Sequence, residues 1–322
     1  MLDLITFGHT TTDVFLEVPE AVVKCDLNHR NCQICLDYAE KIQVKSFHRT
    51  VGGNAPNTAV GVSRLGLLVG VVSRIGKDAN GDFALEILKK ENIKDLKYIV
   101  RDNFLTDYST IINFKGERTI LAFHEKRKYV FPKNVVSAKW GYLSSMGEDF
   151  EKFNEKFLNW AKNCGVKIGF NPGMYELKGG ISKIRNVLKV SEILVVNKEE
   201  AESLVLRGSI AIGTDIKELL VKLFELGPKI IVITDGRNGA YAYNGKTFFR
   251  METFPGVRVE MTGAGDSFSA GLLSALIYGK DIKEALRWGA INSSSVIQKV
   301  GAIEGLLTEW EMYKKLRANR SP

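Results

Sequence analysis

Between residues 140 and 234, short apolar runs alternate with stretches of helical spacing. The apolar runs lie at 141–144, 166–170, 192–196 and 229–234. Parallel strands need a long crossover between them, and a helix packed on the sheet is the usual crossover. Such crossovers are right-handed. We therefore predict an α/β fold in which a mostly parallel sheet is flanked by helices on both faces.

An earlier part of the chain interrupts this alternation with a hairpin. Residues 108–114 and 118–123 are strand-like runs, and the short loop between them contains a glycine. A loop of this kind joins antiparallel strands, and no helical stretch intervenes. We expect a small lid sheet with strands from about 14–18 and 96–124, within one domain that spans residues 1–322.

The composition is typical of a globular protein and narrows the class of function. Of the 322 residues, 45% are hydrophobic and 25% are charged. No apolar run reaches the roughly 18 residues of a membrane span, and the N-terminus lacks the features of a signal peptide. We therefore expect a cytoplasmic protein with no membrane partner.

The net charge is positive without the pattern of a nucleic-acid-binding protein. It amounts to +8, but 37 acidic residues are scattered among 45 basic ones. No basic run interleaved with aromatic residues occurs, so we expect no nucleic-acid partner. An excess of positive charge also suits a protein that handles phosphate-bearing substrates.

Three of the four cysteines lie close together, at Cys25, Cys32 and Cys35. Without a signal peptide we expect reduced thiols. With one nearby histidine, these residues could form a zinc site of the three-Cys, one-His kind. Alternatively, Cys32 and Cys35 fall on one helical face and pack as small buried hydrophobes. The missing second C-x-x-C pair favours packing over metal binding.

The stretch 259–271 combines a glycine-rich turn with the start of a helix. Thr262 is a good N-cap residue, and apolar residues then recur at helical spacing. Gly263 and Gly265 leave the first-turn N–H groups uncovered, and the helix dipole makes that turn an anion site. Asp266 could accept a proton from a hydroxyl there, or it could only complement the dipole.

A second glycine pair precedes another helical stretch. Gly52 and Gly53 let a ligand lie against bare backbone, and Asn54 can cap the helix that follows. Asn57 offers a donor and an acceptor to a hydroxyl-rich ligand. Asp13 lies just past an N-terminal strand, where open α/β sheets bind ligands, although it could also cap a turn.

Two further polar groups follow strands of the predicted sheet. Asn197 and Glu200 open a helix, where they form a capping box or hold waters around Mg²⁺. Thr234, Gly236 and Gly239 end the next strand, and the glycines permit a turn whose backbone contacts a nucleotide. The chain has neither a P-loop nor a dinucleotide-binding G-x-G-x-x-G after a strand.

Together these motifs resemble the ribokinase-like sugar kinases, also called the phosphofructokinase-B family. The resemblance covers nearly the whole chain through four motifs in the family's order: Gly52-Gly53 with Asn57 and Arg64-Leu65-Gly66; Asn197 with Glu200; Thr234 with Gly236 and Gly239; and 262–266 with Phe268 and Gly271. It implies a doubly wound sheet and ATP-dependent phosphoryl transfer to a hydroxyl of a sugar or sugar derivative.

The resemblance also implies roles for individual residues. Asp266 would be the base, and the amides of Gly263, Ala264, Gly265 and Asp266 would form the anion hole. The residues expected to bind the acceptor are Asp13, Gly52, Gly53 and Asn57. Those expected to bind ATP are Asn197, Glu200, Thr234, Gly236, Gly239 and Asn292, and Glu200 would hold Mg²⁺ through water. Many relatives dimerise through the lid, so we expect a homodimer.

Several positions depart from the family's pattern. Glu260 stands where cation-binding relatives usually have Asp, which argues against K⁺ activation, and Asn54 replaces a lysine common in ribokinases. Residues 170–173 are similar to those of some archaeal nucleoside kinases. A nucleoside kinase therefore remains an alternative, and a non-catalytic sugar or nucleotide sensor is the alternative from another class. The complete turn with Asp266 argues against a sensor, because a sensor needs no base.

Overall fold

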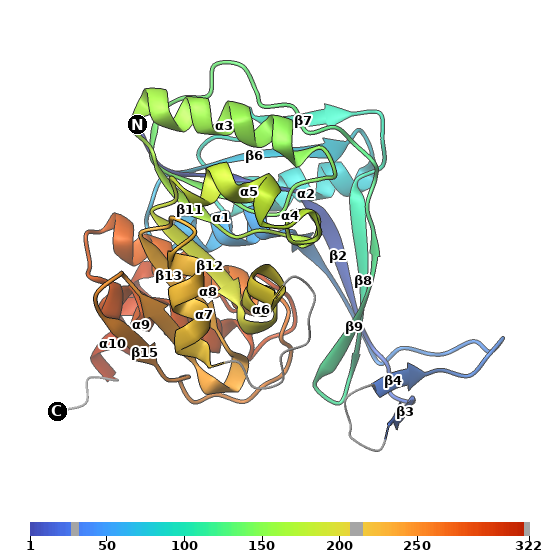
Figure 1. Ribbon diagram of the computed structural model, residues 1–322. Helices are drawn as coiled ribbons and strands as arrows, with labels where there is room; N and C mark the ends of the chain where they lie inside the picture. Colours follow the sequence, from blue (N-terminus) through green and yellow to red (C-terminus); the bar gives the residue numbers. More distant parts are fainter. Residues whose placement is uncertain (27–31, 207–214, 319–322) are drawn as a thin grey trace.

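A nine-stranded sheet forms the centre of the molecule. The computed structural model describes residues 1–26, 32–206 and 215–318 (Figure 1). In spatial order the strands are β15 (Phe248–Met251), β14 (Ala240–Tyr243), β13 (Ile230–Thr234), β12 (Ile193–Asn197), β11 (Lys167–Phe170), β10 (Ala138–Leu143), β1 (Leu2–Phe7), β6 (Val69–Gly76) and β7 (Ile99–Asp102). The ladders from β13 to β7 are parallel, and those of β14 and β15 are antiparallel. The mostly parallel α/β sheet is thereby confirmed.

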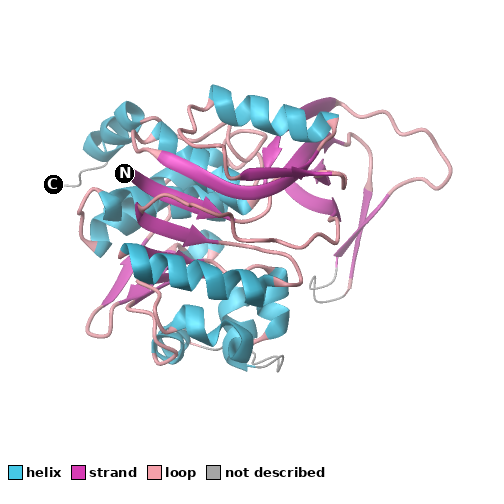
Figure 2. Cartoon of the chain, turned by 90° about the horizontal axis from the view of Figure 1, so that it is seen from above, coloured by secondary structure: helices cyan, strands magenta, loops and turns pink. Residues whose placement is uncertain are grey.

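Helices cover both faces of this sheet (Figure 2). One apolar cluster joins the sheet to α1 (Asn54–Arg64), α2 (Ala79–Lys90), α8 (Ala264–Ile277), α9 (Ile282–Val296) and α10 (Glu309–Ala318). The other joins it to α3 (Phe150–Cys164), α4 (Met174–Gly179), α5 (Ile181–Leu188), α6 (Lys198–Leu206) and α7 (Ile216–Phe224). Leu4 belongs to the first cluster and Ile5 to the second, because successive strand side chains point to opposite faces. Across the described ranges, no helix has the length and apolar character needed to cross a bilayer.

A separate four-stranded sheet projects from this body (Figure 1). Its order is β5 (Ser46–Gly52), β2 (Thr11–Glu17), β8 (Asp107–Phe114) and β9 (Glu117–Phe123), so the predicted hairpin is present. The expected boundary near residue 96 is wrong, because β7 pairs with β6 in the large sheet. Strand β5 was not predicted, since its polar sequence shows no alternation and its pairing with β2 is a long-range contact.

The cysteines differ from the prediction. Strands β3 (Val22–Cys25) and β4 (Cys32–Cys35) form an exposed two-stranded sheet rather than a packed helix. The register places Cys25 opposite Cys32, and the two form a disulfide, so the expectation of reduced thiols is wrong for this pair. Cys35 and Cys164 are free thiols. Within the described part of the chain, no group of three or more His, Cys, Asp or Glu could hold a metal ion.

Arg64, at the end of α1, ties that helix to two other segments. Its Nε and one terminal nitrogen donate to the two carboxylate oxygens of Glu91, both at 2.7 Å. Its other terminal nitrogen donates to the carbonyl oxygens of Ile303 and Leu306, at 2.7 and 3.1 Å. One side chain therefore holds the 303–306 turn and the end of α2 against α1.

We expect Arg64→Ala to lower the free energy of unfolding by about 2–4 kcal/mol, because Glu91 and two carbonyl groups lose their donors. Lys90→Ala is the matched control. It removes an exposed pair with Glu86, 2.6 Å apart, and should cost less than about 0.5 kcal/mol. Denaturant unfolding measures both values, and equal small effects would contradict the bridging role of Arg64.

Candidate active site

The predicted anion turn is present at the start of α8, with one change in its capping. The N-cap residue is Gly263, with φ of 80°, and the helix begins at Ala264. A Cβ on Gly263 would lie 2.7 Å from that of Ala302, so only glycine fits. Thr262 is not the cap, because its hydroxyl donates to Glu260 at 2.7 Å. No side chain caps this turn. The N–H of Ala264 donates to the carbonyl oxygen of Met261 at 3.3 Å, and the N–H groups of Gly265 and Asp266 remain available to a ligand.

Asp266 lies in this first turn and is held by helix α1. Nδ2 of Asn54 donates to its Oδ1, and Nδ2 of Asn57 donates to its Oδ2, both at 2.9 Å. Asn54 is therefore not the predicted cap of α1, a position that Gly53 occupies. Burial raises the pKa of Asp266 and outweighs the two hydrogen bonds, which lower it. A raised pKa makes the carboxylate a better proton acceptor.

Asp13 lies near Asp266 on the small sheet, in strand β2. It is buried, and Oγ1 of Thr11 donates to its Oδ1 at 2.7 Å. Burial raises the pKa of Asp13 to about 6, and the charges of Asp266 and Glu260 act in the same direction. A Cβ on Gly52 would lie 1.9 Å from Oδ2 of Asp13, so the glycine makes room for this carboxylate.

Asn57 carries an acceptor that the protein itself leaves unused. The residue is 3% exposed, and its Nδ2 is bound to Asp266. Its Oδ1 is buried and has no hydrogen-bond partner among the described residues. A buried acceptor without a donor is costly, and a ligand hydroxyl would satisfy it. Asp13, Gly52, Asn57 and Asp266 thus supply polar groups and bare backbone that suit a hydroxyl-bearing acceptor.

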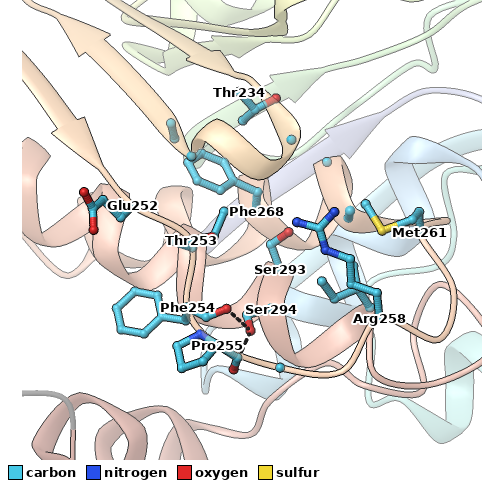
Figure 3. Close-up of a pocket in the computed structure, with 18 residues that line it drawn as sticks. Thr234, Glu252, Thr253, Phe254, Pro255, Arg258, Met261, Phe268, Ser293 and Ser294 are labelled. Carbon is cyan, nitrogen blue, oxygen red and sulfur yellow. Dashed lines mark hydrogen bonds between the residues drawn. The ribbon is translucent and has the colours of Figure 1, made fainter.

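A cavity of about 260 Å³ adjoins the start of α8 (Figure 3). It brings together Thr234, Gly236 and Gly239 from the end of β13 with Ala264 and Gly265 of the anion turn. Other walls were not predicted from the sequence. They comprise Glu252, Thr253, Phe254, Pro255, Gly256, Arg258 and Met261 before α8, Ala290, Ser293 and Ser294 of α9, and Ile297 just after it. Neither segment carries a local motif that would mark it as a binding wall.

Asn292 does not line this cavity, in contrast to the prediction. It is fully buried, and its Nδ2 donates to the carbonyl oxygen of Ser267 at 2.8 Å. Its Oδ1 accepts from the backbone N–H of Leu307 at 3.1 Å. Both ends of the amide are therefore used to brace α8, and the neighbouring Ser293 and Ser294 face the cavity instead.

Asn197 and Glu200 form the predicted capping box. The backbone N–H of Glu200 donates to Oδ1 of Asn197 at 2.8 Å, and that of Asn197 donates to Oε2 of Glu200 at 2.9 Å. Burial raises the pKa of Glu200, and the charges of Glu199 and Asp266 add to the increase. A half-buried carboxylate near a second one fits a hard cation such as Mg²⁺, which binds oxygen ligands.

Glu260 connects the anion turn with the small sheet. It is 2% exposed, and its Oε1 accepts from the backbone N–H of Thr262 at 2.8 Å. Nε of Arg118, on β9, lies 3.9 Å from the same oxygen. Oε2 of Glu260 is buried without a hydrogen-bond partner in the described residues. The small sheet therefore reaches the turn that precedes α8.

A second cavity, of about 400 Å³, opens where β1, β10 and β11 end. His9, which was not predicted as a site residue, lines this cavity. Its Nδ1–H donates to the carbonyl oxygen of Ser145 at 3.1 Å. Burial lowers the pKa of His9, so its Nε2 is a free acceptor. His124 lies across from it, and the hydrogen bond that His124 donates to Asp107 raises the pKa of His124. The one signal for His9 in the sequence is its position two residues after a strand.

Comparisons with known proteins agree with this arrangement. The profile described as "pfkB family carbohydrate kinase" matches residues 13–309. An ATP-dependent 6-phosphofructokinase of Thermoanaerobacterium thermosaccharolyticum is 26% identical over 290 residues, 85% of this chain and 87% of that protein. A nucleoside kinase of Methanothermobacter thermautotrophicus is 24% identical, over 98% of this chain and 96% of that protein. The Arabidopsis thaliana ribokinase solved with ribose and ATP superposes with a TM-score of 0.79 at 21% identity, covering 98% and 99% of the two chains.

Asp13 gives a pH-dependent prediction for stability. Its folded pKa of about 6 exceeds the ordinary 3.8, so its stabilising contribution is complete below pH 3.8 and is lost as pH rises through 6. Ionised Asp13 therefore destabilises the fold by up to about 3 kcal/mol. The stability advantage of Asp13→Asn over wild type should grow by that amount between about pH 4 and pH 8.

Unfolding free energies at several pH values check this expectation. Asp37→Asn, at an exposed position, is the control and should show no such growth. A difference between Asp13→Asn and wild type that stays constant with pH would show that Asp13 is not desolvated as described.

Proposed function

Because the chain belongs to the pfkB family of carbohydrate kinases and is a sugar or nucleoside kinase, we propose that it transfers the γ-phosphoryl group of ATP to a hydroxyl of a sugar or sugar derivative. One observation carries the proposal. Asp266 has a raised pKa, is oriented by two amides, and lies in the uncapped first turn of α8.

In the proposed reaction, Asp266 accepts the proton of the acceptor hydroxyl. The hydroxyl oxygen forms a bond to the γ-phosphorus as the bond to the β–γ bridging oxygen breaks, and ADP leaves with that electron pair. The N–H groups of Gly263, Ala264, Gly265 and Asp266 hold the charge on the transferring group. Asn54 and Asn57 keep the carboxylate in a single orientation, because each binds one of its oxygens.

The nucleotide would occupy the cavity beside α8. Its lining includes Thr234, Gly236 and Gly239. Asn197 lies next to Thr234, because the two are register partners on the adjacent strands β12 and β13. Mg²⁺ supplies charge neutralisation of the phosphates when bound, and Glu200 would hold it through water. Glu260 stands where cation-binding relatives usually have Asp, and Nε of Arg118 lies 3.9 Å from its carboxylate. A positive charge from the protein at this position supports a reaction without K⁺.

The acceptor would lie between Asp13 and Asp266, with Gly53 and the free Oδ1 of Asn57 beside it. Gly53 cannot carry a side chain, since a Cβ would lie 2.4 Å from the carbonyl oxygen of His9. The small sheet carries Asp13 and would act as a lid that excludes water from the reaction. ATP consumption of this kind fits a cytoplasmic protein.

A nucleoside acceptor remains the second candidate because of the cavity near His9. Tyr129, Met174 and Tyr175 line it together with His9 and His124. Aromatic and thioether groups suit a flat base, and the two imidazoles offer a donor and an acceptor. The nucleoside kinase relative, aligned over nearly the full chain, supports the same alternative.

We also propose a homodimer formed through the small sheet. The strand register places Phe47, Leu16, Ile112, Leu121 and Phe123 on the face opposite Asp13. Three of them are strongly exposed, at 64% for Phe47, 57% for Leu121 and 46% for Phe123. An exposed apolar sheet face of this kind is typical of an interface, and the same face on a second copy is complementary to it.

Asp266→Asn should lower kcat about 10²- to 10⁴-fold, because it removes the proton acceptor and keeps the size of the side chain. Binding of ATP should change less than twofold. The assay is ATP consumption with Mg²⁺ across pentoses, hexoses, phosphorylated hexoses, sugar acids and nucleosides. Asp82→Asn, at an exposed position on α2, is the control and should retain full activity.

The acceptor panel separates the candidates. Turnover with sugars alone supports the carbohydrate kinase, and turnover with nucleosides alone supports the second candidate. An Asp266→Asn variant that keeps wild-type turnover would show that this carboxylate is not the base. ATP binding with no turnover of any acceptor would favour a sensor.

Leu121→Lys should convert a dimer into a monomer, since it places a charge within the exposed apolar face. Sedimentation velocity measures the mass of both forms. Leu68→Lys is the matched control, because Leu68 is 49% exposed but lies beside the large sheet. A wild-type protein that stays monomeric at high concentration would rule out the interface.

A further inference from the structure

Arg258 is a cationic side chain in the cavity beside α8 that the roles assigned so far leave unused. It lies in the segment between β15 and α8 and is half-buried. Figure 3 shows its guanidinium pointing into the cavity, near Met261 and Ser293. No residue in the described part of the chain forms an ion pair or a hydrogen bond with this side chain. A guanidinium held in a cavity without an acceptor favours an anionic ligand.

The remaining charges around the cavity support this interpretation. Among the residues that line it, Arg258 is the only basic one, and Glu252 is the only acidic one. Glu252 is exposed and lies at the opposite end of the view in Figure 3. The cavity is therefore positive near Arg258 and is not neutralised there by a carboxylate.

The neighbouring anion turn lacks a full positive charge of its own. Ala264 and Gly265 line the same cavity, and the groups that this turn offers to an anion are neutral backbone N–H groups. Asn54 and Asn57 are also neutral, and their Nδ2 groups are already bound to Asp266. A polyphosphate at this turn thus meets one protein cation on the cavity side, and that cation is Arg258.

We propose that Arg258 binds the phosphate chain of the nucleotide and sets the preference for a polyphosphorylated nucleotide over its unphosphorylated nucleoside. The inference rests on the proposed function, because it takes ATP as the ligand of this cavity. The guanidinium presents several N–H donors in one plane, which matches the oxygens of a phosphate. Arg258 supplies the charge, and the backbone N–H of Gly265 supplies a directed hydrogen bond.

Nucleotide binding without any acceptor tests this role. Each protein is titrated with a fluorescent ATP analogue in Mg²⁺, and adenosine, AMP, ADP and ATP then displace it, so only this cavity is observed. Arg258→Met should raise the dissociation constants of ADP and ATP about tenfold to a hundredfold. The dissociation constant of adenosine should stay within about twofold, and Arg258→Lys should recover part of the loss.

Arg185→Met is the matched control, because Arg185 is exposed on α5 and lies outside the cavity. It should leave all four dissociation constants unchanged. Thermal unfolding of each variant shows whether the fold is intact. The proposal is overturned if the Arg258→Met variant binds ATP as tightly as wild type. It is also overturned if the substitution weakens the binding of adenosine as much as the binding of ATP.

Failure of the kinase proposal gives a different result. If wild type binds ATP and phosphorylates no acceptor, the proposed reaction is wrong, while a selective loss of ADP and ATP in Arg258→Met still supports the role of Arg258. If wild type does not bind the ATP analogue, both proposals are overturned.

Discussion

Close packing of α1 on α8 is the constraint on which the site depends. Gly61 faces Ala270, and a Cβ at position 61 would lie only 2.6 Å from that of Ala270. The absent side chain lets the two helices approach, and their early turns then meet. For this reason the amides of Asn54 and Asn57 reach a carboxylate more than 200 residues away in the chain. A bulkier residue at position 61 would separate the helices and release Asp266.

The same packing concentrates negative charge. Asp13 is buried, Glu200 and Asp266 are half-buried, and burial raises the pKa of each. The charge of Asp266 raises the pKa of both Asp13 and Glu200, so the three carboxylates are mutually unfavourable. Neutral amides offset only part of this cost. These carboxylates therefore destabilise the unliganded site. A bound cation and a hydroxyl that donates a hydrogen bond would reduce their repulsion and their desolvation cost.

The small sheet carries site residues on one face and exposed apolar residues on the other. Asp13 and Arg118 project from one face, where Arg118 approaches Glu260 beside the anion turn. Phe47 and Leu121 lie on the other face and are exposed. In the proposed mechanism, a movement of this sheet would carry Asp13 and Arg118 together. In the proposed dimer, an interface on the outer face would restrict the same movement, so assembly and closure would be linked through one sheet.

The sequence alone determined the features that depend on neighbouring residues. The βα alternation, the 108–123 hairpin, the Asn197–Glu200 capping box and the glycine turn before Asp266 are local patterns, and each is present. The helices, the hairpin and the capping box form their hydrogen bonds between residues that are near in the sequence, so spacing and residue type are sufficient to predict them. Contacts between distant segments were decided only by the tertiary structure. The role of Asn54, the bracing by Asn292 and the inward position of Arg258 all depend on which helix packs beside them. The Cys25–Cys32 disulfide likewise depends on strand register rather than on helical spacing. A polar side chain can satisfy its hydrogen bonds with many partners, and only the packed fold selects one of them.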